Sequence, residues 1–228
     1  LKKEKIFLSD SLSDISHQLK TPLTTMNLLV SLMKKQETTE EEKRDHLNEL
    51  ESLLNRMEWL ILSLLKMSRL DADTVRFQKE TLPVKTMIQK AAAPLLIPME
   101  LRGIAFSVEG EESARFCGDL SWTAEALGNV LKNAMEHTPS GGRISVSFEE
   151  TPLFTRVVVE DTGRGMDPLD LPHIFERFYR SKRAVDQGVG IGLSLARMIL
   201  QRQGGTIKAE NRREGGGRFL IKFYKSIV

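Results

Sequence analysis

A histidine stands in an unusual local setting near the start of the chain. His17 lies in the run SHQLKTP, where the apolar residues otherwise repeat at helical spacing, and Pro22 follows five residues later. A proline inside a helix removes one backbone hydrogen bond and opens the preceding turn, at a cost of about 3 kcal/mol. A lone histidine is usually only a surface residue, but an imidazole beside a helix-breaking residue indicates a placed reactive group.

Two asparagines are candidates for metal and nucleotide binding. Asn129 and Asn133 are four residues apart, so they share one face of a helix expected to begin near Asp119 or Ser121 and to end near His137. Their amide oxygens are neutral, hard ligands that suit Mg²⁺ beside phosphates. The alternative is a pair of solvated polar side chains.

An aspartate with two glycines could recognise a base. Asp161, Gly163 and Gly165 follow the strand-like run VVVE. A carboxylate at a strand end can accept a hydrogen bond from an adenine amino group, and glycines let the backbone pack against the ring. An ordinary turn is the alternative.

A glycine-rich loop precedes the last predicted helix. Gly188, Gly190 and Gly192 lead into it, and such a loop can cradle phosphate with backbone amides and the helix dipole. A Rossmann site is excluded because no strand precedes at the required distance, and no Walker A sequence occurs. Flexibility alone is the other explanation.

Between these motifs, Phe175 and Phe178 could pin the base of a mobile segment, or simply belong to the core. Arg180, Lys182 and Arg183 follow and could meet phosphates once that segment closes.

Two long helices must position His17. Apolar residues recur at alternating spacings of four and three, which predicts a heptad seam, and a second such run follows an acidic segment with Thr39 and Glu42 in capping-box spacing. His17 falls farthest from the seam and should face solvent. The first run comprises Leu8, Leu12, Ile15, Leu19, Pro22, Met26, Leu29 and Met33; the second comprises Leu47, Leu50, Leu54, Met57, Ile61 and Leu64.

A hairpin of this length cannot bury its apolar stripes alone. Leu53, Trp59, Leu60, Leu62 and Leu65 widen the second stripe. We expect two copies to pair into a four-helix bundle, so the chain should be a homodimer; packing against another part of the same chain is the alternative.

Composition sets further bounds. The 228 residues are 40% apolar and 28% charged, and a net charge of +2 argues against nucleic acid as a partner. Cys117, the single cysteine, excludes an intramolecular disulfide and is expected to be buried in a strand. No stretch approaches the roughly 20 apolar residues that span a bilayer.

The order of these motifs resembles that of sensor histidine kinases of bacterial two-component systems. The run SHQLKTP is similar to their phosphoacceptor box, and the Asn, Asp-x-Gly-x-Gly, Phe-x-x-Phe and Gly-x-Gly-x-Gly motifs look like the N, G1, F and G2 boxes of their ATP-binding domain. The resemblance covers nearly the whole chain.

The resemblance implies an α+β fold of two domains. Residues 1–70 would form the dimerisation and phosphotransfer hairpin, 71–84 a linker, and 85–228 an α/β sandwich that binds ATP, of the histidine kinase, gyrase and Hsp90 type. The chain would be the cytoplasmic portion of a membrane-anchored sensor, attached through segments that this chain lacks.

The resemblance also implies an activity. His17 would take the γ-phosphoryl group of ATP and pass it to an aspartate of a response regulator, and Thr21 implies phosphatase activity toward that regulator. Asn133 would bind Mg²⁺ and Asn129 would support the nucleotide. Asp161 would hold adenine, Arg180 would approach the γ-phosphate, and residues 179–187 would form the ATP lid, with Lys182 in it; Gly163, Gly165, Gly188, Gly190 and Gly192 would shape the pocket.

Three residues depart from the family pattern. Gln18 replaces a common acidic residue and is not a useful base, so Asp14 is a candidate substitute. Glu136 stands where a basic residue is frequent; a carboxylate about 4 Å from phosphate would be unfavourable by roughly 1 to 4 kcal/mol, so we expect it to turn outward. Val189 replaces a common threonine.

Because of Gln18 and Glu136, one alternative function stays open: a signalling scaffold of the same fold that is non-catalytic or dominated by phosphatase activity. An ATP-hydrolysing clamp or chaperone relative is a second rival, against which the hairpin and the short lid argue.

Overall fold

The computed structural model describes residues 2–35, 39–181 and 189–225, with side chains from Ile15 onward. The chain divides into two compact units, Leu1–Lys66 and Met67–Val228. Within the described residues, no helix is long and apolar enough to cross a bilayer.

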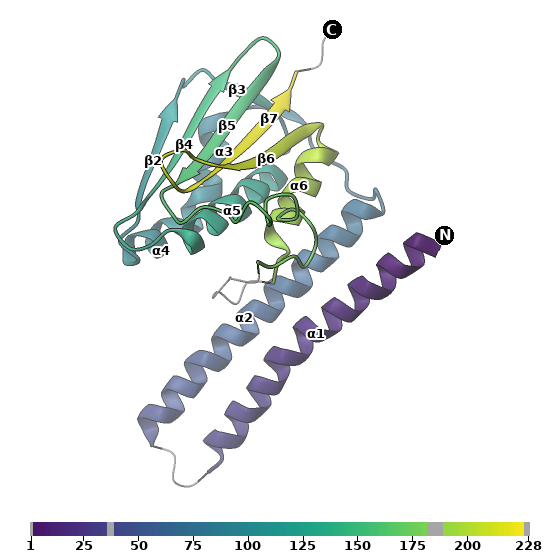
Figure 1. Ribbon diagram of the computed structural model, residues 1–228, viewed down its shortest axis with the longest axis vertical. Coiled ribbons are helices and arrows are strands. Elements are labelled where there is room, and N and C mark those ends of the chain that lie inside the picture. The colour runs from purple at the N-terminus through teal and green to yellow at the C-terminus, as the bar shows by residue number, and fades with distance from the viewer. Residues whose placement is uncertain (1, 36–38, 182–188, 226–228) are drawn as a thin grey trace. The chain divides into compact units, whose positions relative to one another are not determined.

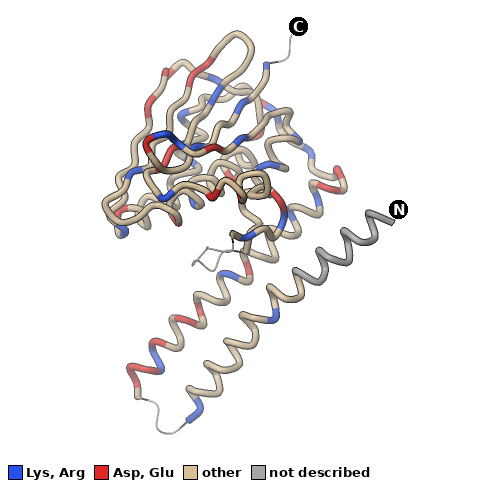
Figure 2. Tube along the Cα trace, viewed as in Figure 1, with Lys and Arg blue, Asp and Glu red and all other residues tan. Residues whose placement is uncertain are grey.

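The first unit contains the predicted pair of antiparallel helices (Figure 1), α1 (Lys2–Met33) and α2 (Glu40–Asp71), except for the last turn of α2, which belongs to the second unit. The expected capping box is confirmed, because Thr39 N donates to Glu42 Oε2 at 2.8 Å and Glu42 N donates to Thr39 Oγ1 at 3.2 Å. The bond from Thr39 N, together with one from Thr39 Oγ1 to the same carboxylate oxygen at 2.9 Å, lowers the pKa of Glu42. Acidic side chains gather on the first turns of α2 (Figure 2), where the helix dipole favours them.

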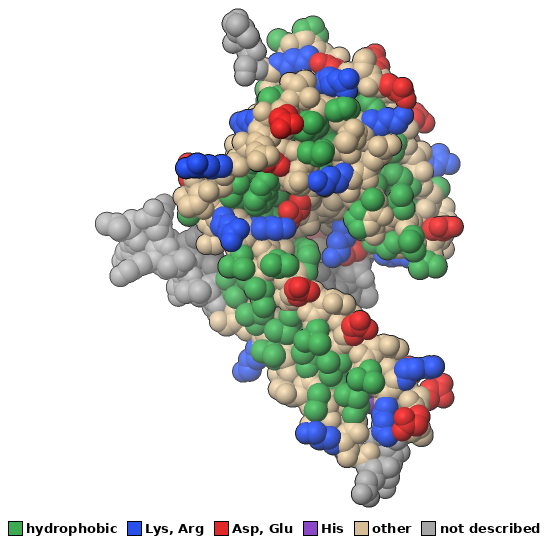
Figure 3. Space-filling model, turned by 180° about the vertical axis from the view of Figure 1, so that it is seen from behind, with side chains coloured by type: hydrophobic (Ala, Val, Ile, Leu, Met, Phe, Trp, Pro, Cys, Tyr) green, Lys and Arg blue, Asp and Glu red, His purple; other side chains and the backbone are tan. Residues whose placement is uncertain are grey.

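The heptad seam is confirmed on α1, where Pro22, Met26 and Leu29 are buried, and α1 continues through Pro22 without a break. Many other apolar side chains of the hairpin stay exposed and form a long band in Figure 3. The most exposed are Leu23, Leu28, Leu47, Leu54, Ile61, Leu62 and Leu65.

The second unit is built on a five-stranded sheet of order β2-β4-β5-β7-β6. Its strands are β2 (Ala105–Gly110), β4 (Arg143–Glu150), β5 (Phe154–Asp161), β6 (Gly205–Asn211) and β7 (Gly217–Tyr224). Only the β2–β4 pair is parallel among these strands; β4–β5 and β6–β7 are antiparallel hairpins. Because β5 is central, its last residue, Asp161, has a strand on either side.

Helices cover one face of this sheet (Figure 1). They are α3 (Val84–Ala92), α4 (Leu96–Leu101), α5 (Leu120–His137) and α6 (Gly192–Arg202), with a 3₁₀ turn at Ala93–Leu95 where Pro94 interrupts. Alternate strand residues such as Val146, Val157 and Phe219 face them and are almost fully buried. Asp119 caps α5, its Oδ1 accepting from Ser121 N and Trp122 N at 3.0 and 3.1 Å.

A separate two-stranded sheet joins the linker to this unit. The linker contains strand β1 (Glu80–Pro83), which pairs antiparallel with β3 (Arg115–Gly118). Cys117 lies on β3, but the prediction that it is buried is wrong, because it is exposed while its neighbour Phe116 is 2% exposed. The pleat places alternate residues on opposite faces, and Phe116 takes the inner one.

Candidate functional site

His17 is exposed on α1, as the heptad count predicts. Thr21 is also exposed, and its Oγ1 donates to the His17 carbonyl at 3.2 Å, so one turn of helix links the two residues. Pro22 has no N–H to donate to the Gln18 carbonyl. Gln18 is half-buried, and Asp14 belongs to the part of α1 whose side chains are not described.

Asp161 is 5% exposed at the end of β5 and has a defined hydrogen-bond pattern. Its Oδ1 accepts from Gly163 N at 2.8 Å and from Gly217 N at 3.1 Å. Both backbone donors use the same oxygen, which leaves the lone pairs of Oδ2 for a donor on a ligand. The remaining oxygen can accept a hydrogen bond from an exocyclic amino group, such as the one that adenine carries.

The glycines beside Asp161 are required by close contacts. A Cβ on Gly163 would collide with the His137 carbonyl at the end of α5, and one on Gly165 would lie 2.8 Å from Asn211 Oδ1. Gly165 also has a φ of +72°, which disfavours any side chain. The loop therefore runs against α5 on one side and against β6 on the other.

Asn129 and Asn133 are half-buried on α5, and α6 begins close to the first of them. A Cβ on Gly192 would lie 3.2 Å from Asn129 Oδ1. In contrast to Asp119 on α5, the N-cap residue of α6, Ile191, makes no side-chain cap hydrogen bond to the first amides of its helix. Amide oxygens beside the first amides of a helix fit a magnesium–phosphate group.

The Phe-x-x-Phe segment is joined to the second glycine loop. Phe178 N donates to the Gly190 carbonyl at 2.9 Å, and a Cβ on Gly190 would collide with the Tyr179 carbonyl. Phe178 itself has a φ of +62°, which is unusual for a residue other than glycine. Tyr179 Oη donates to Asp170 Oδ1 at 2.6 Å.

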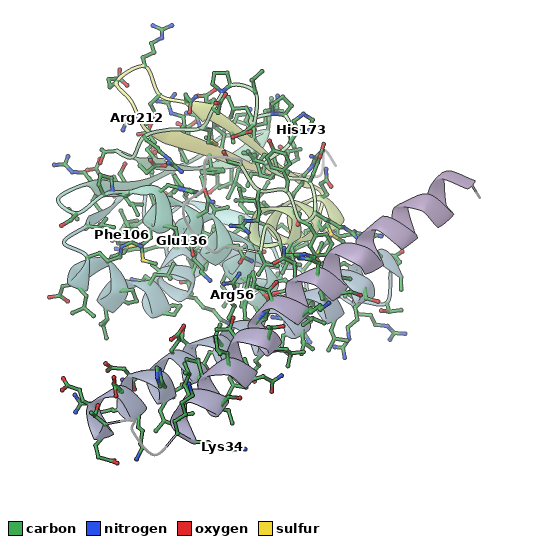
Figure 4. The ribbon with its side chains drawn as sticks, turned by 60° about the horizontal axis from the view of Figure 1, so that its bottom comes forward. Lys34, Arg56, Phe106, Glu136, His173 and Arg212 are labelled. Atoms are coloured by element: carbon green, nitrogen blue, oxygen red, sulfur yellow. The ribbon has the colours of Figure 1, made fainter. Side chains whose placement is uncertain are left out.

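Part of the predicted lid cannot be placed. Lys182, Arg183 and Gly188 lie outside the described residues, whereas Arg180 is described and exposed. Glu136 forms an ion pair with Lys132 one turn earlier on α5, at 3.9 Å, so its charge is balanced along the same helix. Figure 4 marks Glu136 on α5. Within the described part of the chain, no group of three or more His, Cys, Asp or Glu side chains could hold a metal.

Two residues near Asp161 were not foreseen. Asn211 and Arg212 follow one another at the end of β6 and bind the backbone of the Asp161 loop. Their positions in the sequence give no signal, because the partners are 45 and 51 residues away.

Both units match known families. Residues 118–227 match the family "Histidine kinase-, DNA gyrase B-, and HSP90-like ATPase", and residues 7–73 match "His Kinase A (phospho-acceptor) domain".

Individual proteins are similar along almost the whole chain. The sensor protein DivL of Caulobacter vibrioides is 29% identical over 92% of this chain, and the sensor protein SphS of Synechococcus elongatus is 29% identical over 91%. The histidine kinase ThkA, solved in complex with the response regulator TrrA, shares the fold with a TM-score of 0.82 at 23% identity over 99% of this chain. The chain spans 27% of DivL, 52% of SphS and 64% of the ThkA chain.

Proposed function

Since the chain belongs to the sensor histidine kinase family, with its phosphoacceptor and ATPase domains in sequence, we propose that it transfers the γ-phosphoryl group of ATP to His17. One observation carries this proposal. The same chain carries an exposed histidine on a proline-containing helix and a buried carboxylate with one oxygen left to bind a nucleotide base.

The second unit supplies the nucleotide site. Asp161 Oδ2 accepts from the adenine amino group, while Asn129, Asn133 and the start of α6 at Gly192 face the phosphates, with Gly190 in the loop before it. Arg180, which is exposed, adds positive charge near the γ-phosphate. Mg²⁺, when bound beside Asn133, would neutralise charge that develops on the phosphate oxygens.

Phosphoryl transfer needs alignment more than covalent machinery. One ring nitrogen of His17 attacks the γ-phosphorus, the bond to the bridging oxygen breaks, and ADP leaves. The proton on the other ring nitrogen then passes to a base. Gln18 cannot accept it at neutral pH, so we assign this role to Asp14, three residues earlier on the same face of α1.

Radiolabelled ATP tests the kinase. Incubation of the chain with γ-labelled Mg-ATP should give an acid-labile, base-stable phosphoprotein, and His17→Ala should abolish it. His46→Ala, which removes the other histidine of the hairpin, should keep the label. An unlabelled wild-type chain that still binds ATP would instead support the signalling scaffold.

We further propose phosphotransfer to an aspartate of a response regulator, followed by its dephosphorylation. ThkA was solved with such a regulator, TrrA, which supports the first step. Thr21 lies one turn from His17, where its hydroxyl can hold an attacking water. Thr21→Ala should abolish dephosphorylation and leave autophosphorylation intact.

Thr24→Ala is the matched control for the phosphatase. Thr24 is also exposed, and its Oγ1 makes the same kind of bond, to the Lys20 carbonyl at 2.9 Å. If Thr21→Ala and Thr24→Ala lose dephosphorylation equally, the effect comes from a less stable α1 and not from loss of a bound water.

The exposed apolar band of the hairpin supports a homodimer. Leu54 and Leu62 are 52% and 49% exposed on α2, and a second hairpin would cover them in a four-helix bundle. Light scattering should give twice the chain mass, and Leu54→Glu with Leu62→Glu should halve it. Leu169→Glu, at a site 82% exposed in the other unit, should leave the mass unchanged.

The relatives are longer than this chain, so we assign sensing and membrane attachment to segments outside the 228 residues. The chain would then be the cytoplasmic portion of a bacterial sensor.

A further inference from the structure

Residues 161–166 form a loop, called here the Asp161 loop. Asn211, the last residue of β6, holds the far end of this loop. Met166 N donates to Asn211 Oδ1, and Asn211 Nδ2 donates to the Met166 carbonyl, both at 2.7 Å. One amide side chain therefore satisfies both backbone groups of a single loop residue, which fixes that residue relative to β6.

The next residue, Arg212, holds the near end of the loop. Its Nη1 donates to the carbonyl of Asp161 itself at 3.0 Å. A hydrogen bond from a charged donor is stronger than a neutral one, and the Arg212 side chain is only 20% exposed. Figure 4 shows Arg212 beside the turn between β6 and β7.

Arg212 is itself held in place by an acidic neighbour. Its Nε lies 3.5 Å from Glu160 Oε1, at ion-pair distance but without a hydrogen bond, and the same carboxylate oxygen accepts from Arg218 Nε at 2.6 Å. Arg218 also pairs with Glu210 at 3.0 Å. The guanidinium of Arg212 thus belongs to a charge network on strands β5, β6 and β7.

The same turn touches the Asp161 carboxylate directly. Gly217 N donates to Oδ1, and Gly216 packs so closely that a Cβ there would collide with the Asp161 carbonyl. The position of the base-recognising carboxylate is therefore set by a turn more than 50 residues later in the chain.

We propose that Asn211 and Arg212 are positioning residues that fix the loop at residues 161–166 and so set the selectivity of the site for adenine over guanine nucleotides. This inference rests on the proposed ATP site. Adenine presents an amino donor to Asp161, whereas guanine presents a carbonyl oxygen, which a fixed carboxylate repels. A carboxylate that is free to move loses the bond to adenine and relaxes the repulsion of guanine.

Equilibrium binding of ATP and GTP to the whole chain tests this. Arg212→Ala should weaken ATP binding about tenfold, the value of one charged hydrogen bond, while GTP binding changes little. Arg212→Lys, which keeps a charged donor, should restore part of the ATP affinity. Arg213→Ala, at the adjacent exposed arginine, should match wild type.

Asn211→Asp provides a second test without loss of volume. The new carboxylate repels the Met166 carbonyl, so ATP should again weaken while GTP does not. Amide hydrogen exchange of the nucleotide-free chain should speed up at Met166 in this variant, and at Gly163 in Arg212→Ala, with protection in the β4–β5 core unchanged.

Two results would overturn the inference: ATP affinity within twofold of wild type in folded Arg212→Ala and Asn211→Asp, or equal weakening of ATP and GTP. A wild-type chain that binds no ATP would contradict the proposed function instead. If Arg212→Ala does not fold, Asn211→Asp decides the matter by the same two criteria.

Discussion

Arg177 Nη2 lies 2.8 Å from Asp71 Oδ1, so an ion pair joins the Phe-x-x-Phe segment to the last residue of α2. The same nitrogen lies 3.2 Å from Met198 Sδ on α6. A second pair, between Arg202 Nη1 and Asp73 Oδ1 at 2.7 Å, adds to the first. All of these residues belong to the second unit, so one charge pair fastens the start of the linker to the Phe-x-x-Phe segment and the other fastens it to α6.

The Arg177–Asp71 pair should contribute modestly to stability, because Asp71 is half exposed. A double-mutant cycle with Arg177→Ala and Asp71→Asn should give a coupling of about 0.5 kcal/mol in the free energy of unfolding, measured by urea denaturation. The coupling should shrink in 1 M salt, which screens exposed charges. No coupling at low salt would contradict the pair.

Tyr179 should ionise at unusually high pH. The hydrogen bond that it donates to Asp170 chiefly raises the pKa of Tyr179 to about 12, with burial adding to the effect. In a Tyr224→Phe background, which leaves one tyrosine, absorbance near 295 nm should titrate well above the ordinary value near 10. Asp170→Asn should bring the midpoint back toward it.

The same hydrogen bond should make stability depend on pH. The folded chain favours the protonated phenol, so the stabilisation is fully present below about pH 10 and is lost as the pH rises toward 12. Tyr179→Phe should abolish this loss in thermal unfolding scans across that window. An unchanged pH profile would show that another group causes it.

Gly190 should be far less tolerant of a side chain than Gly204. Both have positive φ, +75° and +83°, which costs alanine about 1 kcal/mol, but Gly204 has open space around its Cβ position. Gly190→Ala would also press on the Tyr179 carbonyl and should weaken ATP binding at least tenfold. Gly204→Ala should lower only the unfolding temperature. If both variants weaken ATP binding equally, the close contact between Gly190 and Tyr179 does not shape the ATP site.

The assignment of a base near His17 can be decided by rate. If Asp14 accepts the proton, Asp14→Asn should slow single-turnover autophosphorylation by about 10² or more, the usual range for a general base. Gln18→Glu should change the rate little or increase it. The reverse ranking would exclude Asp14.

Periodicity was sufficient on α1 but not on α2, where Leu47, Leu54 and Ile61 of the predicted seam are exposed within the single chain. The apolar residues of α1 are spaced alternately four and three residues apart. This spacing places His17 on the outside of the helix and Met26 and Leu29 on the inside, as expected. Asp119 could be recognised as a cap because capping is local, and burial alternates along β5 and along β4 as far as Phe148. Local rules of this kind need only the neighbouring residues in the chain.

Contacts between distant segments could not be foreseen. Nothing near Arg212 indicates that it binds the Asp161 carbonyl, and the exposure of Cys117 depends on which face of β3 meets the core. Phe178 combines a positive φ with a hydrogen bond to the Gly190 carbonyl, 12 residues later in the chain. Such features depend on which distant segments meet in the folded chain, and local patterns of residues do not reveal those contacts.

The bond between Gly217 and Asp161 has a consequence for synthesis of the protein. Gly217 follows Asp161 by 56 residues, so at about 5–20 residues per second the ribosome adds it roughly 3–11 s later. During that interval the emerging chain has β5 without β7, and the carboxylate lacks one of its two backbone donors. A nascent chain can thus complete its hairpin, with His17 on the surface, seconds before it can select a nucleotide.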